Sequence, residues 1–249
     1  MGTEADNIVD LYNRHANAWV GARLPEAHLY ERGWLEKFCG LICTGGSVLD
    51  VGCAAGEPMA TYLVKHGYSV TGVDSSRAMI ELFRERLPDQ EALVADMRML
   101  SLERVFPGIL AWDSFFHLNH DDQRRMFPVF RAHAAPRAAL MFTSGPAHGE
   151  AVGQLEGEPL YHASLDSTEY KQLLDSHRFD VVATVPEDGF CYFARVGYRR
   201  DLFSQSSQGS FARVSRPRCL ISGSSFSMSG IANPFAINRR ASAVFPIWA

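Results

Sequence analysis

Five carboxylates recur in the first half of this chain at positions where short apolar runs end or turn. They are Asp50, Glu57, Asp74, Asp96 and Asp113. In an open sheet of parallel strands, ligands bind beyond the carboxyl ends of the strands, so these side chains are expected to gather at one edge. An acidic edge favours a ligand with hydroxyl groups, an ammonium group or a cationic centre, and it disfavours phosphates.

Three histidines follow predicted strand ends and are candidates for a general base: His117, His148 and His162. Histidine changes charge nearest to neutral pH and is the side chain most often used in proton transfer. Each alone is more commonly a solvated or hydrogen-bonded loop residue, but all three are predicted to converge on one rim. The segment 145–166 shows little periodicity, and a loop of that length predicts a lid over a substrate.

The elements that must position these side chains alternate between strand and helix patterns. Short apolar runs, typical of strands buried on both faces, span 47–51, 69–73, 92–95, 108–112, 138–143 and 179–185, with a weaker match at 191–196. Helical spacing of apolar residues covers 5–20, 25–43, 57–65, 77–87, 121–133 and 168–176. This alternation predicts an α/β fold with a doubly wound, mostly parallel sheet.

The turn after the first apolar run consists mainly of small residues, which allow a ligand to approach the backbone closely. Its sequence is Asp50-Val51-Gly52-Cys53-Ala54-Ala55-Gly56-Glu57-Pro58. A dinucleotide fingerprint needs glycine at positions 52, 54 and 57, and only Gly52 matches. Glu57 would also place a negative charge against a pyrophosphate. A nicotinamide-dependent oxidoreductase is therefore a weaker alternative.

Three motifs, taken in order, resemble those of the class I S-adenosylmethionine-dependent methyltransferase family of small-molecule type. They are Val48–Gly56, Val70–Ser76 and Ala95–Met97, and the resemblance covers roughly residues 40–185. It implies a Rossmann-like, mostly parallel seven-stranded sheet with N-terminal helices over the site of S-adenosylmethionine. It also implies in-line methyl transfer to a small organic acceptor, with a histidine base where the acceptor carries a proton.

The same resemblance implies which residues bind the cofactor. Asp74 would accept both ribose hydroxyls, and Asp96 would face the adenine amino group. Tyr12, with Arg23, would close over the cofactor carboxylate. The full implied set is Tyr12, Arg23, Asp50, Gly52, Ala54, Gly56, Asp74, Ser75, Asp96, Met97, Trp112 and Asp113. Ala54 departs from the family, which has its middle glycine there. A purely structural interpretation stands beside these roles, in which the aspartates cap turns and Tyr12 packs in the core.

Charge is distributed unevenly along the 249 residues, whose formal net charge is −4. Residues 1–201 carry −9, which argues against a nucleic-acid groove as the main site. We expect a methyltransferase domain over 1–201, with a helical cap over 1–44 and the Rossmann-like core over 45–201. Residues 202–249 hold five arginines, 11 serines and no acidic residue. This tail is expected to be disordered, with a shifted reading frame or a basic interaction arm as alternatives.

Composition also limits the partners and the compartment. No apolar run reaches the ~20 residues of a membrane span, and the polar N-terminus predicts no secretory signal. Five scattered cysteines argue against a disulfide framework and for the cytoplasm. Cys39 and Cys43 lack further ligands at metal-binding spacing, so no metal site is expected. A small-molecule substrate is expected, and oligomeric state stays open. A catalytically silent cofactor-binding protein with a partner-binding tail is the second function class.

Overall fold

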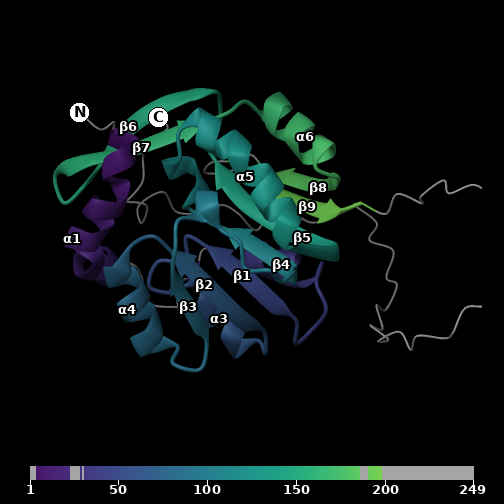
Figure 1. Cartoon of the computed structure of the whole chain (residues 1–249), viewed down its shortest axis with the longest axis horizontal. Helices are drawn as coiled ribbons and strands as arrows, with labels where there is room; N and C mark the ends of the chain where they lie inside the picture. The colour runs from purple at the N-terminus through teal and green to yellow at the C-terminus, as the bar shows by residue number, and fades with distance from the viewer. Residues whose placement is uncertain (1–3, 23–28, 30, 186–189, 198–249) are drawn as a thin grey trace, which may run out of the picture.

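The central sheet has seven strands in the order β3-β2-β1-β4-β5-β9-β8 (Figure 1). It belongs to a computed structural model that describes residues 4–22, 29, 31–185 and 190–197. The strands are β1 (Ser47–Val51), β2 (Ser69–Asp74), β3 (Glu91–Val94), β4 (Phe106–Ala111), β5 (Ala134–Ser144), β8 (Phe179–Val185) and β9 (Phe190–Val196). Strands β1 to β5 are parallel, and β9 lies antiparallel between β5 and β8. The expected doubly wound, mostly parallel seven-stranded sheet is confirmed.

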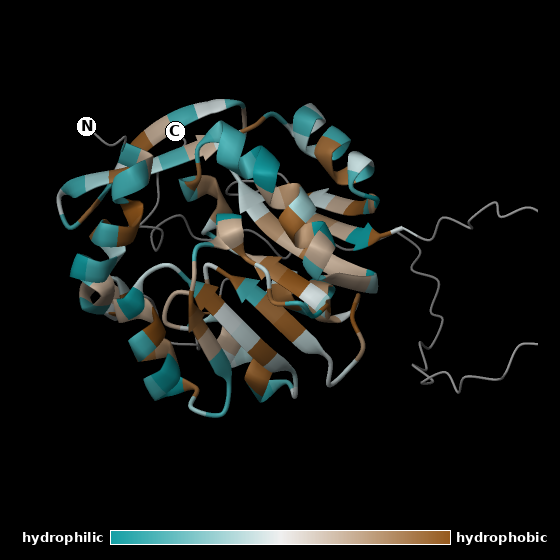
Figure 2. Cartoon of the chain, viewed as in Figure 1, coloured by the Kyte–Doolittle hydropathy of each residue, from teal (hydrophilic) through white to brown (hydrophobic). Residues whose placement is uncertain are grey.

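Helices cover both faces of the sheet, because successive residues of the inner strands point alternately into two apolar cores. Leu49 and Val51 of β1 face the core under α5 (His120–His133) and α6 (Ser167–Ser176). Val48 faces the opposite core, under α2 (Arg32–Cys39), α3 (Met59–Lys65) and α4 (Arg77–Arg86). Figure 2 shows the result, with hydrophobic residues concentrated in the central strands and hydrophilic ones on the outer helix faces.

The strand order reverses at β1, which has β2 on one side and β4 on the other. In sheets of this kind a crevice opens beyond the carboxyl ends of the strands at the reversal. The turns that follow β1, β2, β3 and β4 therefore meet at one edge. This is the edge at which the carboxylates named in the sequence analysis were expected to gather.

The N-terminal segment lies at the same edge as a short 3₁₀ helix (Glu4–Asn7) followed by α1 (Ile8–Ala22) (Figure 1). Leu11 and Ala16 are its buried residues. Asn13 Oδ1 accepts hydrogen bonds from Ser76 Oγ at 2.8 Å and from the Ala78 backbone N–H at 3.2 Å. These bonds anchor α1 to the start of α4.

The segment 145–166, expected to be irregular, is mostly a β-hairpin of β6 (Gly149–Leu155) and β7 (Glu158–Ser164). That expectation was wrong. Glu156 and Gly157 form the two-residue turn and have positive φ angles of 51° and 82°. Turns of this kind match the twist of paired strands. Leu155 packs against Leu11 of α1, so the hairpin supports the N-terminal helix.

Some predictions concern residues outside the described ranges. Arg23 and the tail 202–249 are among them, so the role of Arg23, the state of the tail and the domain boundaries stay predictions. Within the described ranges, none of the helices combines the length and apolarity that crossing a bilayer requires.

Candidate functional site

A pocket lies at the carboxyl ends of β1 to β4, and residues of α1 form part of its wall. Ten of the residues predicted at the cofactor line it: Tyr12, Asp50, Gly52, Ala54, Asp74, Ser75, Asp96, Met97, Trp112 and Asp113. Gly56 lies in the same turn but outside the lining. The structure adds lining residues that the sequence did not single out, among them Asp6, Ile8, Arg98, Ser114, Leu118, Asn119 and Asp122.

The turn after β1 takes its shape from three residues with positive φ angles: Gly52 (75°), Ala54 (46°) and Gly56 (80°). A Cβ atom at Gly52 would lie 2.2 Å from Ser114 Cβ, and one at Gly56 would lie 2.8 Å from the ring of Phe83. Only glycine fits at these two positions. Ala54, which stands where the family has a glycine, adopts the left-handed region that few side chains enter.

The carboxylate of Asp74 connects the turn after β1 to the turn after β2. Its Oδ2 accepts a hydrogen bond from Ala54 N at 2.9 Å, and its Oδ1 accepts one from Ser76 N at 2.8 Å. Burial raises the pKa of Asp74, and these backbone donors act against that rise. The Ser75 backbone N–H is a third such donor, so of the about four lone-pair positions of the carboxylate about one remains for a ligand.

Asp50 lies at the base of the pocket and is only 2% exposed. Burial, followed by the negative charge of Asp74, raises the pKa of Asp50 to about 7. A carboxyl group in this state takes up or loses its proton near neutral pH. A cationic ligand would favour the ionised form, since opposite charge lowers the pKa of an acid.

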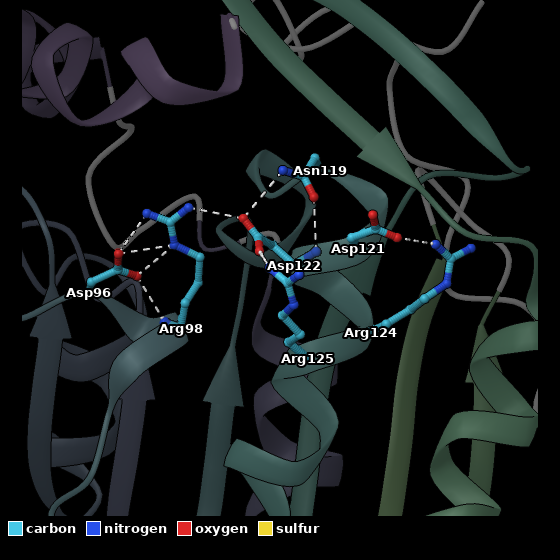
Figure 3. Close-up of polar contacts among 7 residues, drawn as sticks. All are labelled: Asp96, Arg98, Asn119, Asp121, Asp122, Arg124 and Arg125. Atoms are coloured by element: carbon cyan, nitrogen blue, oxygen red, sulfur yellow. Dashed lines mark hydrogen bonds and ion pairs between the residues drawn. The ribbon is translucent and has the colours of Figure 1, made fainter. Parts of the chain in front are cut away.

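Arg98 joins Asp96 to Asp122, which lies at the start of α5 (Figure 3). Its Nη2 donates to Asp96 Oδ2 at 2.6 Å, and its Nη1 donates to Asp122 Oδ2 at 2.9 Å. Burial acts to raise the pKa of Asp96, but the hydrogen bonds from Arg98 outweigh it and lower the pKa. Asp96 is therefore ionised and held in place, and any ligand must share its oxygens with Arg98.

Two hydrogen bonds fix the loop that follows β4. The Asp113 backbone N–H donates to Thr143 Oγ1 at 2.8 Å, and Ser114 Oγ donates to the Val51 carbonyl at 2.7 Å. The loop is thereby tied to β5 on one side and to β1 on the other. Trp112, at its start, carries a buried Nε1 that has no hydrogen-bond acceptor in the described part of the chain.

His117 lies beside the pocket and contacts Tyr12 of α1. The Tyr12 hydroxyl is 2.9 Å from His117 Nε2, and His117 Nδ1 is 2.8 Å from the carbonyl oxygen of Tyr161 in β7. Burial, and then the neighbouring His162, lowers the pKa of His117 to about 3. The ring is therefore neutral at physiological pH, and both of its nitrogens already have partners.

The other two candidate histidines are not among the residues that line this pocket, and their role as bases stays a prediction. His162 is 2% exposed, and its ring centroid lies 4.8 Å from that of His117. Burial lowers the pKa of His162 to about 4. His148 is exposed and stacks on His120 with ring centroids 4.4 Å apart. Both belong to the segment whose hairpin the sequence did not predict.

Outside the pocket, His148, Asp166 and Glu169 place possible ligand atoms within 4.8 Å of one another. Asp166 already caps α6 by accepting hydrogen bonds from Thr168 N and Glu169 N. Glu169 forms an ion pair with Arg124 at 2.6 Å. These partners give the acidic residues structural roles, and the absence of a metal stays a prediction.

The part of the chain that forms most of this pocket resembles known proteins. Residues 48–137 match a family model described as "Methyltransferase domain". This region of the chain is therefore similar to a methyltransferase domain. The matched region holds the turn after β1 and the loops after β2, β3 and β4, and it leaves out α1 and the β6–β7 hairpin.

The chain is also 33% identical over 149 residues to "Methyltransferase GfsG" from Streptomyces halstedii. That match covers 56% of this chain and 51% of the relative, so the chain spans about half the length of that protein. CalS10, an amino pentose methyltransferase from Micromonospora echinaspora solved with S-adenosylmethionine bound, aligns with a TM-score of 0.57 at 16% identity, over 73% of this chain and 96% of that one. At this identity the likeness shows the fold.

A second solved structure is the 1,6-didemethyltoxoflavin-N1-methyltransferase of Burkholderia thailandensis, with 1,6-didemethyltoxoflavin and S-adenosylhomocysteine bound. It aligns with a TM-score of 0.58 at 17% identity, over 77% of this chain and 86% of that chain. This chain thus shares its fold with both solved enzymes.

Proposed function

We propose that this protein transfers a methyl group from S-adenosylmethionine to a small organic acceptor. The observation that carries the proposal is the charge of the pocket lining. Seven carboxylates line it: Asp6, Asp50, Glu57, Asp74, Asp96, Asp113 and Asp122. Among the lining residues that the structure describes, Arg98 is the only lysine or arginine, and two of these carboxylates already bind it. Such a lining favours a ligand with a sulfonium and an ammonium group.

Different residues of the pocket are assigned to different parts of the cofactor. Asp74 has an acceptor position left for a ribose hydroxyl, and its orientation is fixed by backbone donors. Asp96 and Met97, at the end of β3, belong to the adenine end. Gly52 and the loop after β4, on the other side of Asp74, belong to the methionine end. This order follows the strand order of the sheet.

S-adenosylmethionine, when bound, supplies an activated methyl group, and the bond from sulfur to that carbon breaks as the bond to the acceptor forms. The chain's own contribution is to hold the reactants in line and away from water. Of the three candidate bases, only His117 lines the pocket, and it contacts Tyr12 there. His117 is therefore the candidate to influence the proton that the acceptor releases.

The acceptor is proposed to be a small molecule rather than a nucleic acid. The acidic lining opposes a phosphate backbone. Trp19, Met59 and Leu118 add apolar surface to the lining. Phe115, in the loop after β4, is fully buried in the core and adds no surface to this wall. CalS10 acts on an amino pentose and the Burkholderia enzyme on a toxoflavin precursor, which supports a small acceptor here.

Titration calorimetry tests the cofactor. We expect S-adenosylhomocysteine to bind the full chain and NAD to give no heat. Binding of NAD in place of S-adenosylhomocysteine would favour the oxidoreductase alternative. A mass-spectrometric screen of hydroxylated and amine acceptors with S-adenosylmethionine then separates an enzyme from a silent cofactor-binding protein, because only an enzyme yields products heavier by one methylene.

A further inference from the structure

A second hollow, of about 600 Å³, adjoins the pocket at the start of α5, and we call it the polar hollow. It shares Arg98, Asn119 and Asp122 with the pocket, so the two spaces meet at these residues. Every residue that lines it in the described part of the chain is polar or charged. Small-molecule pockets are lined mostly by apolar groups, so this lining indicates a ligand that forms hydrogen bonds on most of its sides.

The charges of the arginines and carboxylates around the polar hollow balance. It is lined by three arginines and three carboxylates, which are Arg98, Arg124, Arg125, Asp121, Asp122 and Glu150. The pocket beside it differs, because its described lining has seven carboxylates and one arginine. A phosphate in the polar hollow would meet the carboxylates, and an ammonium group would meet the guanidinium groups. The balance therefore favours a neutral ligand.

Asp121 and Arg125 of α5 keep hydrogen-bonding capacity for a ligand. Asp121 Oδ1 accepts a hydrogen bond from Arg124 Nη1 at 2.8 Å, and Arg125 Nη1 donates one to Asp122 Oδ1 at 2.9 Å (Figure 3). Both side chains are exposed, so the second oxygen of Asp121 and further N–H groups of Arg125 are left. The two residues are four positions apart on a helix, which makes them neighbours on one face.

A hydroxyl group suits such a pair, because it donates one hydrogen bond and accepts others. One of two adjacent hydroxyls can donate to Asp121 while the other accepts from Arg125. Glu150 of β6 supplies another carboxylate to the same hollow. Its Oε1 lies 3.7 Å from His120 Nδ1, and its side chain also bonds to that of Tyr161. Donors and acceptors from two elements thus face one space.

His120 joins the two elements that form the walls of the polar hollow. Its Nε2 lies 3.1 Å from the carbonyl oxygens of both Gly149 and Ser164, which pair at the end of the β6–β7 hairpin. The exposed ring of His148 stacks on His120, with an angle of 12° between the planes. Imidazole has an apolar face, against which the carbon face of a sugar ring can pack.

We propose that the polar hollow holds the methyl acceptor, and that this acceptor is a neutral molecule with several adjacent hydroxyl groups, such as a glycoside. The proposal rests on the proposed function and names its substrate class. The acceptor enters the pocket where the two spaces meet, at Arg98, Asn119 and Asp122. A hydroxyl oxygen of the acceptor bonds to the methyl carbon as the bond from that carbon to sulfur breaks, and the hydroxyl proton passes to water.

Saturation-transfer NMR of the full chain tests the ligand class without any cofactor. The probes are the methyl glycosides of glucose, galactose, mannose and rhamnose, with glucose 6-phosphate and glucosamine as charged counterparts. We expect saturation transfer to at least one neutral glycoside and weaker transfer to both charged sugars at equal concentration. Absence of transfer to all four glycosides would overturn the proposal, and so would equal or stronger transfer to a charged sugar.

Asp121→Ala and Glu150→Ala test the location. Each removes a carboxylate that lines the polar hollow and does not line the pocket. We expect about tenfold weaker binding of the glycoside, because hydrogen bonds to charged groups are strong, and unchanged affinity for S-adenosylhomocysteine. The matched control is Glu85→Ala, at an exposed position on α4, which should bind both ligands like the wild type. Undiminished glycoside binding by both variants would place the glycoside elsewhere and overturn the proposal.

Turnover separates an acceptor from a ligand that merely binds. With S-adenosylmethionine present, a glycoside that binds should gain a methyl group, and Asp121→Ala should raise its KM while kcat changes little. A bound glycoside that is never methylated would overturn the acceptor role. If the chain fails to bind S-adenosylhomocysteine, the proposed function fails, and the NMR result still decides whether the polar hollow binds hydroxylated molecules. If S-adenosylhomocysteine binds and no glycoside does, this inference fails while the proposed function stands.

Discussion

The backbone N–H of Ala54 donates a hydrogen bond to Asp74 Oδ2 at 2.9 Å, and this bond joins the first two motifs of the pocket. The donor lies in the turn after β1, and the acceptor ends β2. Ala54 has a φ angle of 46°, so the bond comes from a left-handed residue. Asp74 therefore has two tasks, since it shapes the turn and also offers the acceptor position assigned to the ribose.

Replacing Asp74 with alanine removes both roles at once. In Asp74→Ala we expect at least tenfold weaker binding of S-adenosylhomocysteine, because hydrogen bonds to a charged acceptor contribute about 1.5–3 kcal/mol each. Calorimetry gives the affinity, and circular dichroism checks the fold. Asp175→Ala, at an exposed position on α6, is the matched control and should bind normally. Undiminished binding by a folded Asp74→Ala would refute the assignment.

Asp50 makes the free energy of unfolding depend on pH, and its contribution falls as the pH rises. Its folded pKa of about 7 lies above the ordinary aspartate value of 3.8, so between these values the folded state holds a proton that the unfolded state has lost. The contribution of Asp50 to stability is present below pH ~4 and is lost as pH rises through about 7, at up to about 1.4 kcal/mol per pH unit.

Asp50→Asn removes this titration. Its free energy of unfolding relative to wild type should rise between pH 4 and about 7 and then level off, as measured by urea denaturation at several pH values. A constant difference over that range would mean that Asp50 is ionised throughout. Because a cationic ligand favours the ionised form, S-adenosylmethionine should also bind wild type more tightly at pH 8 than at pH 6.

His117 has the opposite dependence on pH. Its folded pKa of about 3 lies below the ordinary histidine value of 6.5, so the unfolded state binds the proton first and stability falls as pH drops from about 6.5. We expect His117→Asn to flatten this fall by about 1.4 kcal/mol per pH unit relative to wild type. Measurements above pH 7.5, where the ring is neutral in both states, supply the baseline offset. An unchanged slope would show that the ring is protonated in the fold.

Gly52 is required by both its backbone angle and its neighbour. Gly52→Ala should destabilise the fold by more than about 2 kcal/mol, because alanine is strained at a φ of 75° and its Cβ meets Ser114. Thermal denaturation measures the loss. The double variant with Ser114→Gly should recover the steric part and leave the backbone part. If the double variant were no more stable than Gly52→Ala, the contact with Ser114 would not be the cause.

The sheet was predictable because its signals are local. Residues 47–51 form a short, mainly apolar run between glycines, as burial on both faces of a strand requires. Asp74, Asp96 and Asp113 were found for a related reason, since each directly follows such a run. The start of β5 was missed because Pro136 and Arg137 interrupt its apolar run before residue 138.

The β6–β7 hairpin and the surroundings of the candidate histidines could not be predicted, because they depend on contacts that the sequence does not show. The turn residue Glu156 has a positive φ, for which asparagine, aspartate or glycine would have been the usual signal. Alternation along β6 is weak, because Gly149 and Gly153 stand among its residues. Arg98 and Asp122 are 24 residues apart on different elements, so only the folded chain brings them together.

The family match begins and ends inside the chain at residues 48 and 137, so it contains the binding turns but neither α1 nor the hairpin that supports α1. Glu158 of the hairpin holds Arg14 and His15 of α1, so these two segments behave as one unit although they are encoded far apart. Replacing α1 alone would therefore leave Glu158 without its partners, so a chimaera that exchanges α1 should exchange β6–β7 with it.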